Sequence, residues 1–279
     1  MSVTPGRPQD LPDFRKPPVA ETVLSLQFEP IGGLTTAHVG LLWQRFRDQL
    51  PLVEERPPLP PVFERFEAPK PPEVEVTVKD RLPAPRVWFL NQAKTELIQV
   101  QPDRLVHNWR KVLGIEPYPR YEPIREKFRQ EVEIFEQLLR DEGVGTLIIN
   151  QCEVTYVNHI EPSGVWERHG QLDMVLRNWS RLPTGIFLPE PEDAAARIRF
   201  VIPSQGKPVG RLHVSFQPAW KKADNSALFS LTLTARGMPL GEGKEGAFAF
   251  FDLGRRWIVK AFADLTTPEM QLIWERTDA

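Results

Sequence analysis

Residues 20–29, AETVLSLQFE, define the first element of the fold. Small and apolar side chains alternate with polar ones along this stretch, and Val23 is the one exception. A two-residue period places the first set on one face of a β-strand and the second set on the other. The segment is therefore predicted to be a strand with one buried face.

A helix is predicted directly after the Gly32-Gly33 turn. Thr35 or Thr36 supplies a side-chain oxygen for its N-terminal cap, and apolar residues follow at helical spacing as far as Phe46. The helix should end near Pro51, since proline interrupts a helix. The elements predicted next are strands at 73–79, 86–91 and 95–101 and a long helix from about Pro123 to Gly143.

After Gly143 the same order of elements recurs. The elements predicted there are a long strand at 146–160, a shorter helix at 172–179, strands at about 197–202, 209–217 and 227–236, a second long helix at 245–264, and a small helix after the capping-box sequence 266–269. The predicted fold class is α+β, with two similar β-α-β-β-β-α halves whose mostly antiparallel sheets each pack on a long helix. Chance similarity in the order of elements is the alternative explanation, and the sequence leaves it open.

Two segments of the chain are rich in proline, with five prolines in residues 1–18 and eight in 51–72. Proline lacks a backbone donor and has a fixed φ, so neither segment can be a helix or a central strand. We predict an arm at 1–18, a first half at 19–144 and a second half at 145–279. The connector 51–72 should be docked on the first half, because a free linker gains nothing from its apolar residues, Leu59, Val62, Phe63 and Phe66.

Composition excludes several classes of protein. The 279 residues are 41% hydrophobic and carry a formal charge of -2, which indicates a globular protein without a generally basic surface. We expect a cytoplasmic protein without membrane contact, because the chain has no apolar run of membrane-spanning length and no apolar leader at its start. The single cysteine, Cys152, and five scattered histidines indicate no internal disulfide and no zinc site, so no metal or cofactor is expected.

Between Arg86 and Ile160 the chain contains RVWFLN, TELIQVQPDR, NWRK, YPRYEPI and NQCEVTYVNHI. With KPPVAETVLSLQF, AHVGLLWQRFRDQLP and EERPPLPP before them and RRWIVKAFADLTTPEMQLIW near the end, these sequences resemble a sporadically distributed bacterial family of uncharacterised proteins. The resemblance covers nearly the whole chain but implies no activity, substrate or catalytic residue. The patchy occurrence of that family implies accessory genes, such as anti-phage or toxin-linked islands.

The first candidate site is the Arg/Trp loop 104–121, which is predicted to join a strand to the long helix. Guanidinium groups and aromatic faces are the groups that bind phosphates and bases. Packing within an ordinary structural loop is the alternative interpretation. The candidate residues for binding an anion are Arg104, Asn108, Trp109, Arg110, Arg120 and Tyr121, with His107, Lys111 and Tyr118 beside them.

The second candidate site is the predicted strand 150–160, which is unusually polar. Alternation places Gln151, Glu153, Thr155, Val157 and His159 on one face and Cys152, Val154, Tyr156, Asn158 and Ile160 on the other. Gln99 and Gln101 likewise share a face of their strand. If these polar faces converge they form a hydrogen-bonding wall in a concavity, and otherwise they face water. The candidate residues here are Gln99, Gln101, Glu153, Tyr156, Asn158 and His159.

Two sequence features that could indicate a catalytic dyad and a dinucleotide-binding loop are weak. Cys152 and His159 fall on opposite faces of one strand, roughly 20 Å apart along it, so they cannot form a nucleophile and base. The sequence GEGKEG at 241–246 matches a dinucleotide-binding pattern, but its two acids would repel a pyrophosphate and no parallel strand can follow its helix. No catalytic residue is predicted.

Three functions follow from these observations. The first is a non-catalytic binding or interaction protein with a protein partner. The family resemblance would make it an accessory component of a bacterial defence or toxin-linked system. The second is a sensor or enzyme for a small anionic ligand or nucleotide, with a polar cavity between the halves. The third is nucleic-acid binding through the Arg/Trp loop, which would depend strongly on salt.

Overall fold

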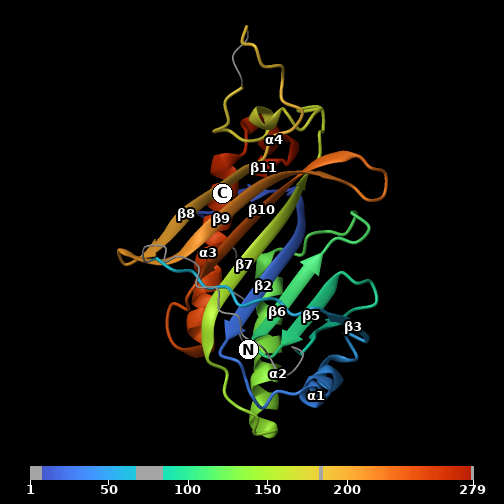
Figure 1. The fold of residues 1–279 in the computed structure, drawn as a ribbon, viewed down its shortest axis with the longest axis vertical. Coiled ribbons are helices and arrows are strands. Elements are labelled where there is room, and N and C mark those ends of the chain that lie inside the picture. The colour runs from blue at the N-terminus through green and yellow to red at the C-terminus, as the bar shows by residue number, and fades with distance from the viewer. Residues whose placement is uncertain (1–7, 67–83, 182–184, 278–279) are drawn as a thin grey trace.

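The computed structural model describes residues 8–66, 84–181 and 185–277. They form a mixed α+β structure in which a large antiparallel sheet carries helices on one face (Figure 1). The elements in chain order are β1 (Asp13–Phe14), β2 (Val19–Phe28), α1 (Thr36–Phe46), β3 (Leu52–Arg56), β4 (Arg86–Leu90), β5 (Glu96–Gln101), β6 (Arg104–Arg110), α2 (Tyr121–Asp141), β7 (Ile149–Ile160), a 3-10 turn (Leu172–Met174), β8 (Ala196–Ser204), β9 (Lys207–Trp220), β10 (Ala227–Gly237), α3 (Gly243–Leu265), α4 (Pro268–Ile273) and β11 (Arg276–Thr277).

The main sheet has nine strands in the order β3-β4-β5-β6-β2-β7-β10-β9-β8, and β1 and β11 form a separate pair. Its centre is the antiparallel pairing of β2 with β7, in register at Leu24 and Val154. These two strands come from the two predicted halves. One continuous sheet therefore replaces the two separate sheets that were predicted, because β2 and β7 each offer the other an unpaired edge.

The hydrophobic core lies between the sheet and the helices α2 and α3, which run behind the sheet in Figure 1. Even-numbered residues of the two central strands, such as Leu24 and Val154, face these helices and are fully buried. On α2, Phe128 and Phe135 fall seven residues apart on the buried stripe, so the apolar face of the helix covers the apolar face of the sheet. We call the opposite surface of the sheet the open face.

The three longer helices lie where the sequence predicts them, at Thr36–Phe46, Tyr121–Asp141 and Gly243–Leu265. The predicted helix at 172–179 is wrong, because only Leu172–Met174 forms a short 3-10 turn. Backbone groups of this segment bond instead to the end of α3, as Thr267 N donates to Val175 O at 3.0 Å. The apolar residues of 172–179 thus pack against the end of α3 without forming a helix of their own.

Four strands lie in segments for which none was predicted: the short pair β1 and β11, and the strands β6 and β3 of the main sheet. Arg104–Arg110 is strand β6, although it was assigned to the Arg/Trp loop. Its odd-numbered residues face the helices and its even-numbered residues lie on the open face, so the segment follows the ordinary two-residue period. Leu52–Arg56 is the edge strand β3 within the proline-rich connector. The predicted strand at 73–79 lies outside the described residues.

The predicted internal duplication is not confirmed. The first half of the described chain has four strands, β3 to β6, between its two helices, whereas the second half has no α-helix between β7 and β8. The order β-α-β-β-β-α is therefore not found in either half. Among the helices of the described residues, none has both the length and the apolarity needed to cross a membrane.

Candidate functional site

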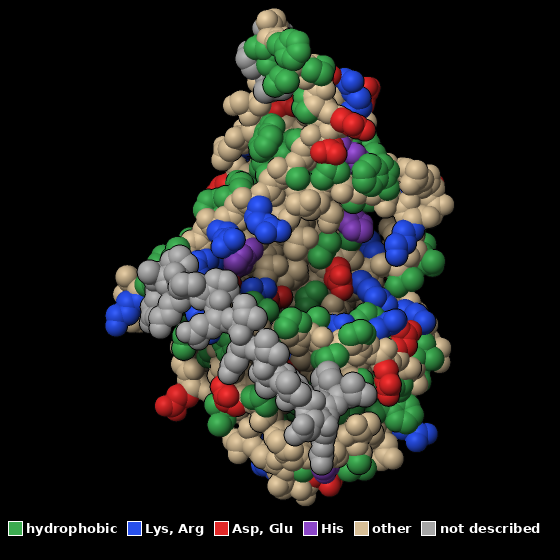
Figure 2. Space-filling model, viewed as in Figure 1, with side chains coloured by type: hydrophobic (Ala, Val, Ile, Leu, Met, Phe, Trp, Pro, Cys, Tyr) green, Lys and Arg blue, Asp and Glu red, His purple; other side chains and the backbone are tan. Residues whose placement is uncertain are grey.

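The open face of the sheet is polar and carries the larger group of candidate residues. It is hollowed at its centre, with basic side chains on both sides of the hollow (Figure 2). One row of residues crosses the strands near one end of the sheet, as the register of each strand pair shows. From β3 to β7 this row is Arg56, Arg86, Gln101, Arg104, Gln27 and Gln151.

Residues 57–66, which we call the strap, cross the open face over this row (Figure 1). Three buried glutamines on three strands accept hydrogen bonds from strap backbone N–H groups: Gln101 from Leu59 at 3.0 Å, Gln27 from Val62 at 2.8 Å and Gln151 from Glu64 at 3.3 Å. Gln101 also donates to the carbonyl of Leu59 at 3.0 Å. The side chains of the sheet thus satisfy the backbone of a segment that is not itself a strand.

The spacing of these contacts matches the geometry of the sheet. Gln101, Gln27 and Gln151 lie on β5, β2 and β7, which are separated by three strand intervals in all. Three intervals of about 4.8 Å span roughly 14 Å, and five residues of an extended proline-rich segment at about 3.1 Å each span roughly 15 Å. An extended strap therefore meets successive strands without having to bend.

The strap is anchored by the carboxylate of Glu64. His213 Nε2 lies 2.5 Å from one of its oxygens, Arg211 Nη1 donates to the other at 2.8 Å, and Arg236 lies 3.5 Å away. The Glu64 side chain is only 6% exposed. Burial opposes its ionisation, but hydrogen bonds from His213 and Arg211 outweigh burial and lower the pKa of Glu64 to about 2. The guanidinium carbon of Arg211 also lies over the ring of Phe66, 4.4 Å from the ring centroid.

This anchor predicts a pH-dependent contribution to stability. The pKa of Glu64 is about 2 in the folded chain and about 4.5 when free, so its ionised form stabilises the fold above about pH 4.5. That contribution, roughly 2–3 kcal/mol, is lost as pH falls towards 2. Urea unfolding at a series of pH values should show wild type more stable than Glu64→Gln at neutral pH and equal to it near pH 2. Glu55→Gln, an exposed change on β3, is the control, and an equal pH profile for both variants would contradict the prediction.

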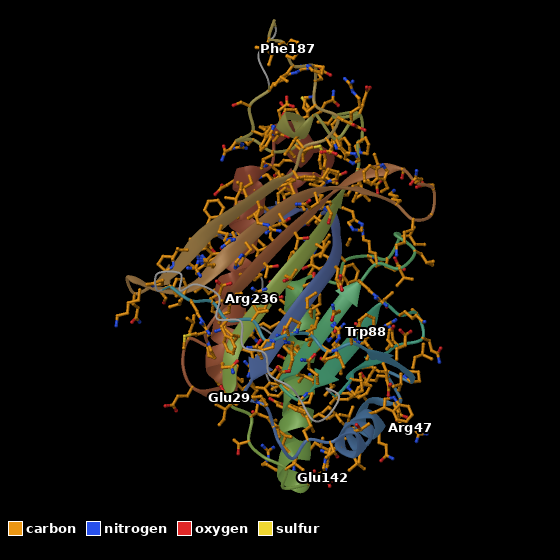
Figure 3. The ribbon with its side chains drawn as sticks, viewed as in Figure 1. Glu29, Arg47, Trp88, Glu142, Phe187 and Arg236 are labelled. Carbon is orange, nitrogen blue, oxygen red and sulfur yellow. The ribbon has the colours of Figure 1, made fainter. Side chains whose placement is uncertain are left out.

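On the β3–β6 side of the open face, arginines surround Trp88. The guanidinium carbons of Arg56, Arg86 and Arg110 lie 4.8, 5.4 and 5.6 Å from its ring centroid. Figure 3 places Trp88 and Arg236 on opposite sides of the open face. Burial and the neighbouring Arg104 and Arg56 lower the pKa of Arg86, although an arginine stays charged at neutral pH.

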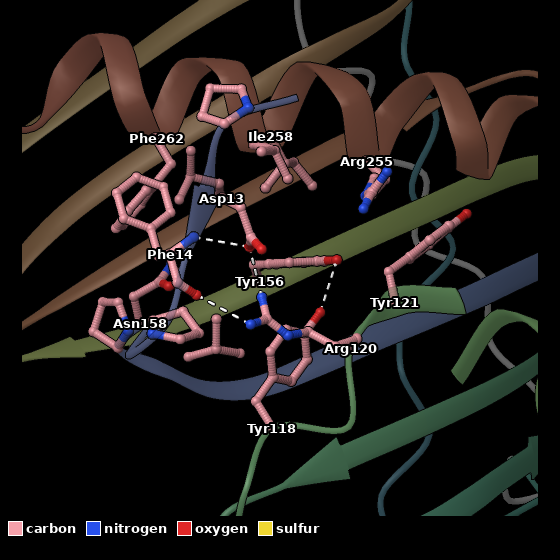
Figure 4. Close-up of a pocket in the computed structure, with 16 residues that line it drawn as sticks. Asp13, Phe14, Tyr118, Arg120, Tyr121, Tyr156, Asn158, Arg255, Ile258 and Phe262 are labelled. Carbon is pink, nitrogen blue, oxygen red and sulfur yellow. Dashed lines mark hydrogen bonds and ion pairs between the residues drawn. The ribbon is translucent and has the colours of Figure 1, made fainter. Parts of the chain in front are cut away.

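The opposite face of the sheet contains a small cavity of about 50 Å³ beneath the N-terminal arm (Figure 4). All three tyrosines of the chain line it. Tyr118 donates to Tyr156 at 3.0 Å and Tyr121 donates to Asp252 at 2.8 Å, while burial raises the pKa of each tyrosine. The three phenols are therefore neutral, and the space is large enough for one or two waters but too small for a nucleotide.

The arm closes this cavity through Arg120. Its guanidinium donates to Asp13 at 2.7 Å and to the carbonyl of Phe14 at 3.1 Å. Arg120 has φ 75°, a left-handed conformation that is unfavourable for a residue with a long side chain. The two bonds to the arm hold it there, so Arg120 acts as a structural tie between the arm and the start of α2.

The sequence candidates thus fall on two faces of one sheet and do not surround a common cavity. Those on the open face are Gln99, Gln101, Arg104, Asn108, Arg110, Glu153 and His159. Those on the helix face or at its edge are Trp109, Arg120, Tyr121, Tyr156 and Asn158. Trp109 is buried, with its ring 5.4 Å from that of Tyr118, so its faces are already covered.

Several open-face candidates bond to one another. Gln99 accepts from Arg86 at 2.8 Å and donates to Asn108 at 2.6 Å, and Asn108 in turn donates to Glu21 at 2.6 Å. This chain of amides joins β4, β5, β6 and β2 across the face. Asn158 on the other face donates to the carbonyl of Leu231 at 3.1 Å, which is a structural role.

Sequence reasoning missed the residues that hold the strap. Arg211, His213 and Arg236 lie 147 to 172 positions from Glu64 along the chain, so no local pattern connects them with it. The apolar content of the connector was the one available signal. It indicated that the connector is docked, but it did not indicate on which strands. Cys152 is fully buried, and burial raises its pKa well above the ordinary range. Among the described residues no three potential metal ligands come together.

No protein-family model matches the chain, and no curated protein or solved structure matches it. Function is therefore argued from the geometry of the open face.

Proposed function

We propose that the chain is a non-catalytic binding protein whose open face receives an extended, acid-bearing peptide segment of a protein partner. The observation that carries the proposal is the strap. Three glutamines contact its backbone and one basic site holds its carboxylate, at Glu64. Backbone contacts tolerate many sequences, whereas the Glu64 site requires an acid, so together they define a class of peptide.

The length of the connection supports this proposal. β3 and β4 are antiparallel neighbours, and Arg56 pairs with Arg86. A turn of about two residues is enough to join such strands. The chain instead connects them through residues 57–85, and residues 57–66 of this connection cross the open face. The strap is then an internal peptide that occupies the face until a partner replaces it.

Competition with the strap determines the apparent affinity of a partner for the open face. A tethered segment has an effective concentration on the order of millimolar, so it reduces the apparent affinity of any peptide for the same contacts. A partner segment must therefore bind the open face better than the strap does, or bind when the strap has been pulled away.

The test uses a shortened chain in which an Asn-Gly turn joins Arg56 to Arg86. A labelled peptide, PPLPPVFERF, reproduces residues 57–66, and fluorescence anisotropy measures its binding. We expect the shortened chain to bind this peptide at least about tenfold more tightly than the full chain does, because the tethered competitor is gone.

Two controls decide whether binding uses the strap site. The same peptide with its glutamate replaced by glutamine should lose at least about tenfold in affinity, since Arg211 and His213 then lose the carboxylate that they contact. Arg197→Gln on β8, an exposed change on the same face opposite Ser215, should leave binding unchanged. A shortened chain that is folded but does not bind the peptide would contradict the proposal.

The resemblance implies a partner in a bacterial defence or toxin-linked system, and co-purification of the full and shortened chains from the native host tests it. A cytoplasmic location is likewise proposed. The strand order supports an internal duplication, because β2 and β7 lie side by side and each is followed outward by antiparallel neighbours, β6-β5-β4-β3 beside β2 and β10-β9-β8 beside β7.

A further inference from the structure

The strand β8 forms one border of the main sheet (Figure 1). Its register with β9 is regular from Ala196 to Ile202 and shifts at Pro203. Within the described residues β9 is the only strand that pairs with β8, and no other segment makes a backbone hydrogen bond to residues 196–202. Alternate N–H and C=O groups of this stretch therefore point outward, where a further strand can bind them.

The two borders of the sheet differ in how well they resist such pairing. The other border, β3, has five residues and carries the charged side chains Glu54, Glu55 and Arg56, which disfavour the addition of a strand. β8 has nine residues, and its Phe200 and Val201 side chains are 38% and 50% exposed. A long edge with exposed apolar side chains is a template for pairing, so β8 is the border that is suited to a partner strand.

A groove lies beside β8 on the helix face of the sheet. α3 packs mainly over β7 and β10, so the helix side of β8 extends beyond it. The groove has a volume of about 470 Å³ and is lined in part by Phe200 and Leu212 from the sheet and by Trp257 and Ala261 from α3. Every second side chain of an added strand would point to this face, and an apolar one would contact Phe200 there.

The other side of β8, on the open face, is basic. Arg197 and Arg199 are exposed, and neither makes an ion pair with a described residue. Arg199 lies opposite His213 of β9, but the nearby carboxylate of Glu64 is already held by His213, Arg211 and Arg236. Acidic side chains of an added strand would lie opposite the two arginines of β8, as favourable cross-strand pairs do.

We propose that β8 binds a β-strand of a protein partner, with acidic side chains opposite Arg197 and Arg199 and apolar side chains on the groove beside Phe200. The backbone of the edge supplies affinity in this mode, and the alternating side chains supply specificity. A second copy of this chain is disfavoured, because antiparallel pairing about the middle of residues 196–202 places Arg199 opposite Arg199. The partner strand therefore alternates acidic with apolar residues.

This docking edge is separate from the contacts of the strap. The glutamines that contact the strap backbone lie on β5, β2 and β7, and the residues that hold Glu64 lie on β9 and β10. Among the contacts that the structure describes, none joins β8 to the strap. Strand addition at β8 and peptide binding on the open face can therefore fail independently.

The test compares two short synthetic peptides, one alternating glutamate with valine and the other alternating lysine with valine. Fluorescence anisotropy measures their binding to the full chain at physiological ionic strength. We expect saturable binding of the acidic peptide and at least about tenfold weaker binding of the basic one, because only the first complements the arginines of β8. Reversing both charges, with Arg197→Glu and Arg199→Glu in one chain, should exchange the preference between the two peptides.

The matched control is Arg15→Glu with Arg47→Glu. These arginines are also exposed, lie on the arm and at the end of α1, and change the net charge by the same amount. The control should alter the affinity for either peptide by less than about twofold, since distant surface charges are screened. Equal effects of the two double variants would mean general attraction to a charged surface and would overturn the proposal.

N-methylated peptides test whether binding uses a strand edge. Alternate residues of a strand direct their N–H groups to the same edge, so methylating the glutamates or the valines blocks one edge only. One methylated peptide should lose at least about tenfold in affinity and the other should retain it. Equal losses would contradict strand addition.

Three further results would overturn the proposal. The first is no saturable binding of the acidic peptide to a full chain that is folded by circular dichroism. The second is binding only to the folded shortened chain, which would assign the edge to a part of residues 57–85. The third is a dimer of the full chain that dissociates when the acidic peptide is added, which would assign the edge to a second copy. Size-exclusion chromatography with light scattering measures the last of these.

Discussion

Replacing Glu131 by alanine should lower the free energy of unfolding by about 1–3 kcal/mol, the cost typical of leaving a buried hydrogen-bonding group without its partner. Glu131 on α2 faces His107 on β6, with His107 Nδ1 2.9 and 3.0 Å from its two oxygens. Both side chains are at most 5% exposed. Without Glu131, the imidazole stays buried with no acceptor for its Nδ1 group, while its Nε2 already has no partner in the described residues.

Two further variants separate loss of the pair from loss of the helix surface. Glu133→Ala removes a carboxylate from the same helix, where Glu133 is half exposed and pairs with Lys244, and should cost less than about 1 kcal/mol. Replacing His107 and Glu131 together by leucine should restore most of the stability, because neither buried polar group remains. Urea denaturation measures all three. Similar losses in Glu131→Ala and Glu133→Ala would contradict the assignment of a buried pair.

Gly237→Ala should destabilise the chain by about 3 kcal/mol through overpacking. Gly237 on β10 pairs with Gly210 on β9, directly beneath Phe250 of α3. A Cβ at position 237 would overlap the carbonyl oxygen of Val209 and lie 2.5 Å from a Phe250 ring carbon. Backbone on one side and a buried ring on the other leave no flexible group to move aside.

The control is the same substitution where space is free. Gly40 lies on the exposed surface of α1, and a Cβ there meets nothing within 4 Å. Gly40→Ala should therefore stabilise the helix, by about 0.5–1 kcal/mol. Adding Phe250→Leu to Gly237→Ala should recover part of the loss, since it removes one of the two contacts. Thermal unfolding of the three variants checks the signs, and a neutral Gly237→Ala would show that α3 is not packed this closely.

Local periodicity was enough to predict the faces of individual strands. The alternation of Gln151 and Glu153 with Cys152 and Val154 correctly separates the open face of β7 from its buried face. The same rule missed β6, because a basic, aromatic sequence such as that around Trp109 was interpreted as a loop. The prediction of a loop at 104–110 followed the composition of the segment and ignored its two-residue period, and it was wrong.

Long-range placement could not be predicted in the same way. A strand pattern does not say which strand it pairs with, so the joining of β2 to β7 into one sheet was not foreseen. The destination of the strap depends on contacts such as Glu64 with Arg211, 147 positions apart. These contacts form only when the sheet is assembled, and no local sequence feature encodes them.

The Glu64 anchor also has a consequence for the newly made chain. Glu64 and Arg236 are 172 positions apart, and synthesis at about 5–20 residues per second separates them by roughly 10–30 s. During that interval β2 can pair with β6, but β9 and β10 do not yet exist. The nascent protein therefore spends this interval without the Glu64 anchor, and the contacts of Glu64 are the last contacts of the strap to form.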